Sequence, residues 1–65
     1  MTETYFGDLT PGTFVINVEK ENEWGIGQVQ SSIDNKITIN FENVGKKTVN
    51  PEEVELKIIN INGIN

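Results

Sequence analysis

Short segments in which apolar and polar residues alternate run through most of the chain, as they do in half-buried β-strands. The clearest is residues 36–42 (KITINFE), where Ile37, Ile39 and Phe41 are predicted to face the core. No window carries the apolar stripe of a helix of two turns or more. The apolar residues are also mostly Ile and Val, which favour strands. The pattern therefore predicts an all-β fold.

The same alternation predicts four further short strands. They lie at residues 13–19 (TFVINVE), 26–33 (IGQVQSSI), 46–49 (KKTV) and at the closing run 54–58 (VELKI).

Two of these strands carry a specific expectation about their faces. In 13–19, the apolar residues Phe14, Ile16 and Val18 share one face of the expected strand, whereas Val15 lies on the other. We therefore expect a bend or bulge that lets both faces touch the interior. In 26–33, one face is expected to hold Val29, Ser31 and Ile33.

Turn signals separate the strands. Pro-Gly at 11–12 is typical of a type II turn, because proline presets φ at the second position and glycine accepts positive φ at the third. Asp-Asn at 34–35 predicts a tight two-residue hairpin. Residues 50–53 (NPEE) place a capping residue before a proline and two acids, which is a helix-start pattern. Because alternation resumes at once, we expect only one helical turn before the last strand.

Five short strands, a tight hairpin and one helical turn before the last strand describe a small five-stranded SH3-like or Tudor-like barrel. A chain of 65 residues forms one domain. We expect the barrel at residues 11–59, a flexible leader at 1–10 in which Tyr5 and Phe6 can lie against the domain, and a frayed C-terminal tail at 60–65.

The chain has no cysteine and no histidine. Disulfides, thiolate chemistry and cysteine zinc sites are therefore excluded, and the usual general base is missing. Ser31 and Ser32 have no histidine with which to build a catalytic triad. We expect a protein that is not an enzyme and has no cofactor or metal. The chain also shows no signal-peptide pattern and no membrane-spanning apolar run, so we expect it in the cytoplasm.

Ten acidic and five basic side chains give a net charge of −5, which opposes binding to a phosphate backbone. Any contact with nucleic acid must use a local patch, and the candidates are Lys46 and Lys47 with Lys36. The same lysines also fit a solvated strand end. The acidic residues before Trp24 fit a solubilising loop, or they attract a basic partner; they are Glu19, Glu21 and Glu23.

Residues 22–30 (NEWGIGQVQ) contain the single tryptophan and two glycines spaced by one residue. This is not a phosphate loop, because the third glycine of the dinucleotide fingerprint is absent and a strand follows instead of a helix. The glycines are expected to allow a tight bend and close packing under an aromatic ring. Trp24 fits either a packing anchor or a contact residue for a partner. An aromatic cage for methylated lysine would need Tyr5 or Phe6 beside Trp24, and is disfavoured.

The segments PGTFV, EWGIGQVQS, KITINFENVGKKTVN and VELKII, in this order, resemble domain of unknown function 3553, a family of small bacterial proteins. The matching residues are Trp24, Gly25, Gly27, Phe41, Gly45 and Lys46. More distantly, the chain resembles the Tudor-like C-terminal domain of UvrD/PcrA-type helicases and the CarD-type RNA-polymerase-interacting domain. Asn17 stands where these proteins commonly carry histidine, so a role tied to that histidine does not transfer.

We expect a monomeric protein-interaction module. The distant resemblance implies a partner in bacterial transcription or DNA repair, with RNA polymerase as the leading candidate. The expected contact surface is Trp24, Gly25, Ile26, Gly27, Gln28, Lys46 and Lys47. One alternative is weak binding of single-stranded nucleic acid, with Trp24 stacking on bases and the lysines holding phosphates. Another is a structural role in an assembly, through a sheet edge or an apolar patch with Ile59 and Ile61.

Overall fold

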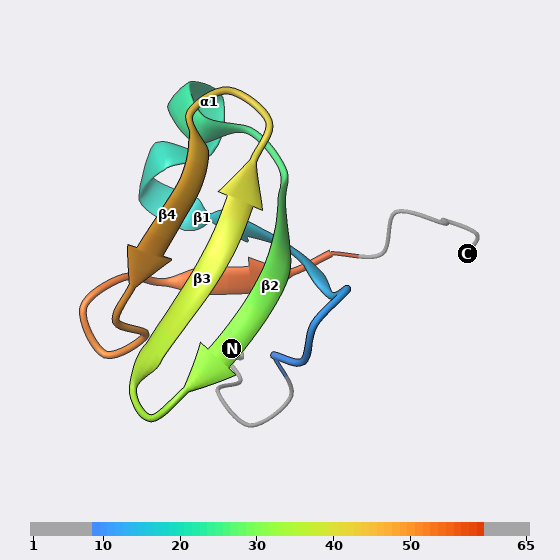
Figure 1. Ribbon diagram of the computed structural model, residues 1–65. Helices are drawn as coiled ribbons and strands as arrows, with labels where there is room; N and C mark the ends of the chain where they lie inside the picture. The colour runs from blue at the N-terminus through green and yellow to red at the C-terminus, as the bar shows by residue number, and fades with distance from the viewer. Residues whose placement is uncertain (1–8, 60–65) are drawn as a thin grey trace.

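A computed structural model describes residues 9–59 of the chain (Figure 1). Its elements are β1 (Phe14–Asn17), the 3-10 helix η1 (Val18–Lys20), α1 (Glu21–Trp24), β2 (Gly27–Ile33), β3 (Lys36–Phe41), β4 (Gly45–Val49) and β5 (Leu56–Ile58). The prediction of a five-stranded all-β domain is confirmed. The expectations for residues 1–8, with Tyr5 and Phe6, and for the tail 60–65, with Ile61, fall outside the described residues.

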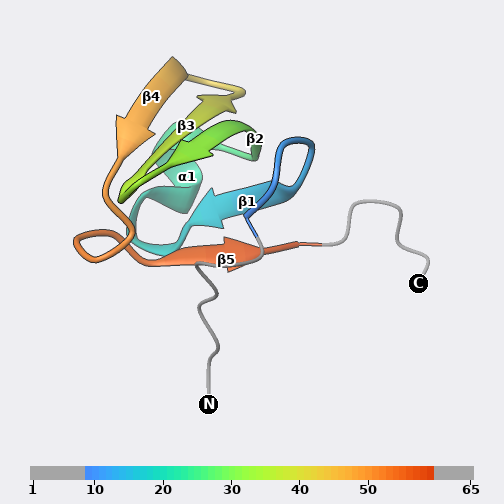
Figure 2. The same ribbon diagram turned by 60° about the horizontal axis from the view of Figure 1, so that its bottom comes forward.

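The five strands form one antiparallel sheet in the order β4-β3-β2-β1-β5. The sheet is strongly bent, so that β4, β3 and β2 make one layer while β1 and β5 run beneath it in a second (Figure 2). Among residues 9–59 no ladder joins β4 to β5, and these two strands are the edges of the sheet. The bend brings the inner faces of the two layers together around the core.

The core is built from the inner positions of all five strands. Ile37, Ile39 and Phe41 are at most 2% exposed, as the alternation of residues 36–42 predicts. The remaining members of the core cluster are Leu9, Val15, Val29, Val49 and Leu56. Trp24 and Val54 pack against this cluster from its margin.

Leu9 is the first residue that the structure describes, and it lies two residues before the expected domain boundary. Leu9 is 2% exposed and belongs to the core, so it is not part of a flexible leader. It is followed by the expected type II turn: Gly12 has φ of 98°, and Thr13 N donates to Thr10 O at 3.1 Å. Gly12 N also donates to Val29 O at 2.9 Å, which ties the turn to β2.

The first strand carries buried apolar residues in both of its competing phases, Val15 in one and Ile16 in the other. Val15 is fully buried in the core, whereas Phe14 and Ile16 lie on the opposite face of β1. Phe14 pairs with Gln28 of β2, and Ile16 pairs with Lys57 of β5. Both faces of β1 are partly covered, so the number of apolar residues on a face does not identify the inner one.

β1 also ends earlier than expected, at Asn17. The buried Asn17 side chain, 3% exposed, accepts a hydrogen bond from Glu19 N at 3.1 Å through Oδ1 and caps η1. Val18 and Glu19 therefore belong to η1 and not to the strand. The expected bend is a change from strand to helix.

The helical segment of the structure lies between β1 and β2, where the sequence predicted a polar connection. It consists of η1 and α1. Residues 50–54 make the expected single turn, in which Asn50 O accepts from Val54 N at 3.2 Å and Asn50 Oδ1 accepts from Glu52 N at 2.9 Å. This turn does not continue into a regular helix. No helix within residues 9–59 is long and apolar enough to cross a membrane.

The hairpin at 34–35 is confirmed, with Asp34 at φ of 56° and Ile33 paired with Lys36. The face expected for the preceding strand holds only in part. A register shift between Val29 and Ser31 makes Gln30 a bulge, so the phase of the strand changes there. Ile33 consequently lies outside the core and is 66% exposed.

Candidate functional site

The chain makes a sharp corner between α1 and β2, and three hydrogen bonds hold this corner against the turn after β3. Asn43 N donates to Trp24 O at 3.0 Å, and Glu42 N donates to Ile26 O at 2.9 Å. The carboxylate of Glu42 accepts from Ile26 N at 3.1 Å. We call residues 24–26 together with the turn 42–44 the Trp24 corner. Its backbone is fixed on both sides of the tryptophan.

Glycine is favoured at both positions of the corner motif, by the positive φ at Gly25 and by the lack of space at Gly27. Gly25 has φ of 78°, and a Cβ there would lie 2.7 Å from Glu42 Oε1. A Cβ on Gly27 would lie 2.5 Å from Ile39 Cγ2 and 2.6 Å from Phe41 Cδ1. The prediction of a tight bend with close packing under an aromatic ring is therefore confirmed.

The indole of Trp24 is half-buried and has two neighbours that differ in character. Its ring meets that of Phe41 at an edge-to-face angle of 61°, with centroids 5.0 Å apart. The ammonium of Lys47 lies 5.3 Å from the Trp24 ring centroid, within the range of a cation–π interaction. Trp24 is thus a packing residue, and the part of its ring that stays accessible is where a partner would touch it.

The two lysines of the predicted surface lie on opposite faces of β4. Lys47 pairs with the buried Ile39 and lies on the inner side, where it reaches Trp24. Lys46 pairs with Asn40 and is exposed on the outer face, the side of the β2–β3–β4 layer turned away from the core. The single surface expected from the sequence is therefore two surfaces. Strand alternation alone implies this separation, because neighbouring residues of a strand point to opposite faces.

The rest of the predicted surface borders a shallow hollow of about 240 Å³ on the outer face. Ile26, Gly27 and Gln28 line it, as the position of the motif suggests. Four lining residues were missed: Phe14, Asn40, Phe41 and Glu42. Asn40 and Gln28 pair across β3 and β2, so only the strand register reveals that they share this hollow.

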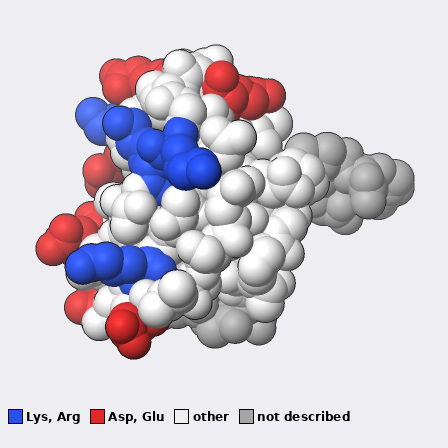
Figure 3. All heavy atoms as spheres, viewed as in Figure 1, with Lys and Arg blue, Asp and Glu red and all other residues white. Residues whose placement is uncertain are grey.

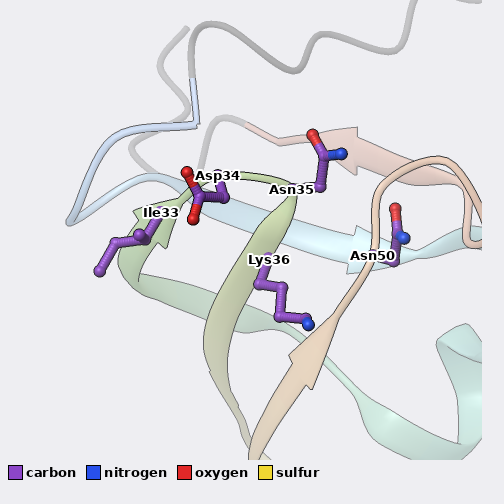
Figure 4. A pocket seen from close by; sticks show the side chains of 5 residues that line it. All are labelled: Ile33, Asp34, Asn35, Lys36 and Asn50. Carbon is purple, nitrogen blue, oxygen red and sulfur yellow. The ribbon is translucent and has the colours of Figure 1, made fainter.

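A second, larger hollow of about 440 Å³ lies at the other end of β2 and β3 (Figure 4). It is lined by the hairpin tip and by the start of the loop after β4, through Ile33, Asp34, Asn35, Lys36 and Asn50. Of the residues considered for binding, only Lys36 is found here. Lys46 pairs with Asn40, four residues along β3 from Lys36, a distance of about 13 Å of extended chain. Lys36 is therefore not brought next to Lys46.

The charges are divided between the strands and their connections. β2, β3 and β4 carry three of the five lysines and no acidic residue. Figure 3 shows the positive side chains over this layer, with acidic side chains at its margins, including the upper end where Figure 1 shows α1. Within residues 9–59 one ion pair is present, between Lys20 and Glu23 at 3.7 Å.

The arrangement offers an accessible aromatic ring with a cation, two amides on the outer face and exposed carboxylates. In the described part of the chain no three Asp or Glu side chains gather in a way that could hold a metal ion. These groups suit the binding of another molecule by stacking, hydrogen bonding and charge.

Fold and site together define a small antiparallel β-domain with a tryptophan corner. The chain belongs to the family described as "Protein of unknown function (DUF3553)", whose model matches residues 9–59. The resemblance carried by WGIGQVQS is thereby confirmed, and the family match begins at Leu9, a member of the core cluster. No curated protein and no solved structure matches the chain.

Proposed function

We propose that this protein is a non-enzymatic, monomeric protein-interaction module of the bacterial cytoplasm that binds its partner through the Trp24 corner. The partner belongs to the transcription or DNA-repair machinery, and RNA polymerase is the leading candidate. The distant resemblance to the Tudor-like helicase domain and to the CarD-type domain supports this choice of partner. The proposal also assigns the bent sheet to the SH3-like and Tudor-like barrels that those domains represent.

The observation that carries the proposal is the half-buried indole of Trp24 on a rigid support. Phe41 holds one part of the ring, and hydrogen bonds from Asn43 and Glu42 fix the backbone around it. A tryptophan that is already immobile loses little conformational entropy on binding, which is why such residues are frequent binding hot spots. The contact surface is therefore centred on Trp24 and Gly25 with Lys47.

The outer-face residues of the predicted surface take a secondary place in this proposal. Ile26, Gly27 and Gln28 line the shallow outer hollow, and Lys46 is on the same outer face, paired with the lining residue Asn40. A partner that wraps around the corner would reach both surfaces, whereas a flat partner would reach only one.

A direct binding experiment tests the proposal. The tagged protein is used to capture proteins from the native host, and RNA polymerase or a repair factor recovered in this way is then purified and titrated. We expect Trp24→Leu, which keeps an apolar side chain against Phe41, to weaken binding at least ten-fold while circular dichroism shows a folded domain. Ile33→Ser is the matched control, because Ile33 is exposed at the opposite end of β2 (Figure 1). Equal binding of both variants would overturn the proposal.

One observation favours a second function, the binding of single-stranded nucleic acid. β2, β3 and β4 present lysines and amides without any acid, so this layer is locally less negative than the whole chain. With two to three phosphate contacts, affinity for a labelled 20-nucleotide strand should fall about ten-fold between 50 and 200 mM salt. Lys36→Gln and Lys46→Gln should weaken such binding, whereas a protein interface anchored by Trp24 should respond little to salt.

A further inference from the structure

We infer that the Trp24 corner accepts an arginine side chain from a basic segment of the partner, and that Lys47 occupies this position in the free protein. This inference rests on the proposed function and specifies the chemistry of the partner. It comes from the contact between Lys47 and Trp24 together with the charges around that contact.

The Lys47 ammonium shows that the ring accepts a cation. Lys47 is half-buried on the inner side of an edge strand, with its Nζ 5.3 Å from the Trp24 ring centroid. Among residues 9–59 its ammonium has no carboxylate within 4.0 Å, since the ion pair there joins Lys20 and Glu23. The ring is thus the group that holds this charge. Because the Lys47 ammonium is carried on a flexible four-carbon stem, it can move into solvent when a cation that binds the ring more tightly is present.

The charges near the corner attract a basic partner. Glu21 and Glu23 lie on α1 with Trp24, and both are exposed. The Glu42 carboxylate lies against Gly25, the residue after Trp24, and bonds Ile26 N. These acidic residues stand on the helical turn that ends in Trp24 and on the turn hydrogen-bonded to the corner, and Glu23 among them is paired with Lys20. A cation placed on the indole would therefore enter a region in which acidic side chains outnumber basic ones.

Arginine fits this position better than lysine. Its guanidinium is flat and more weakly hydrated than an ammonium, so it stacks on an indole at a smaller desolvation cost. Its five N–H donors can also reach a carboxylate while the plane stays on the ring. Lys47, held by the ring alone, is a weak competitor: releasing a cation–π contact at an exposed site costs about two- to five-fold in affinity.

The experiment uses a synthetic peptide, acetyl-GSRGSRGSG-amide, and the same peptide with both arginines replaced by glutamine. The full chain contains one tryptophan, so a change in intrinsic fluorescence on titration reports on Trp24 itself. We expect the arginine peptide to change the emission with a saturable dependence on concentration. The glutamine peptide should leave it unchanged at the same concentrations.

Two single-lysine variants separate the ring contact from general charge. Lys47→Gln should tighten binding of the arginine peptide about two- to five-fold, because the internal competitor is gone. Lys57→Gln removes the same charge from an exposed position of β5 that is not part of the proposed contact surface, and is expected to change binding by less than about two-fold. Trp24→Leu, followed by calorimetry because the fluorophore is lost, should weaken binding at least five-fold.

The inference is overturned if both peptides bind alike, or if Lys47→Gln and Lys57→Gln change the affinity equally. Its failure is distinguishable from failure of the proposed function. If the arginine peptide does not bind but partner capture still depends on Trp24, the corner is a protein site for another side chain. If capture is also independent of Trp24, both statements are wrong.

Discussion

Gly27 and Phe41 face each other across β2 and β3, and no side chain fits between them: a Cβ on Gly27 would lie 2.6 Å from Phe41 Cδ1. The ring that fills this space is the one against which Trp24 packs. The second glycine of the motif therefore acts on the tryptophan indirectly, by allowing Phe41 to lie under it.

Gly27→Ala is expected to lower the free energy of unfolding by about 1–3 kcal/mol, because the methyl group overpacks the core next to Ile39 and Phe41. Gly45→Ala is the matched control. Gly45 has φ of 79° with open space around it, so alanine there carries only the backbone strain, about 1 kcal/mol. Urea denaturation followed by Trp24 fluorescence measures both. A Gly27→Ala variant as stable as the wild type would show that Ile39 and Phe41 can shift to accommodate the added methyl group.

Ile33 and Ile37 flank the hairpin and should respond very differently to truncation. Ile37 is 2% exposed in the core, so Ile37→Ala is expected to cost about 2–5 kcal/mol. Ile33 is 66% exposed because of the bulge at Gln30, so Ile33→Ala should cost less than about 1 kcal/mol. Thermal unfolding of the two variants gives the comparison directly. Equal losses would mean that β2 and β3 pair without the bulge.

Asn17 has a structural task that can be tested by keeping or removing its oxygen. Asn17→Ala deletes the acceptor that caps Glu19 N and should destabilise the domain by about 1–2 kcal/mol. Asn17→Ser retains a hydroxyl oxygen near the same place and should recover part of this loss. Denaturant titrations of the two variants decide between a capping role and simple burial, for which both substitutions would be equally harmful.

The sequence predicted β3 and the hairpin before it closely, because nothing interrupts the alternation of Ile37, Ile39 and Phe41. It predicted the type II turn at 11–12 for a similar reason, since the two residues act locally. It left the inner face of β1 open, because apolar residues stand on both faces of that strand and both faces are partly covered. The prediction that Ile33 shares a face with Val29 was wrong, because composition and periodicity do not reveal the extra residue of a bulge.

The sequence predicted which residues form the corner, but it did not predict how they are arranged in space. WGIGQVQS identified the corner, and the space around Gly25 and Gly27 explains why glycine stands there. The contact between Lys47 and Trp24 joins an edge strand to a helix end, and no local pattern encodes such a pairing. The opposite placement of Lys46 and Lys47, in contrast, follows from strand alternation.

The placement of these two lysines has a consequence for colloidal behaviour. β4 is an edge of the sheet, and the backbone N–H and C=O groups on the side of β4 away from β3 could pair with a strand of another chain. Lys46 and Lys47 project from adjacent positions to opposite sides of this edge. A strand that paired with this edge would have to remove water from the ammonium groups on both faces. Lys46 and Lys47, which lie on the two faces of the predicted surface, therefore also protect the domain against edge-to-edge aggregation.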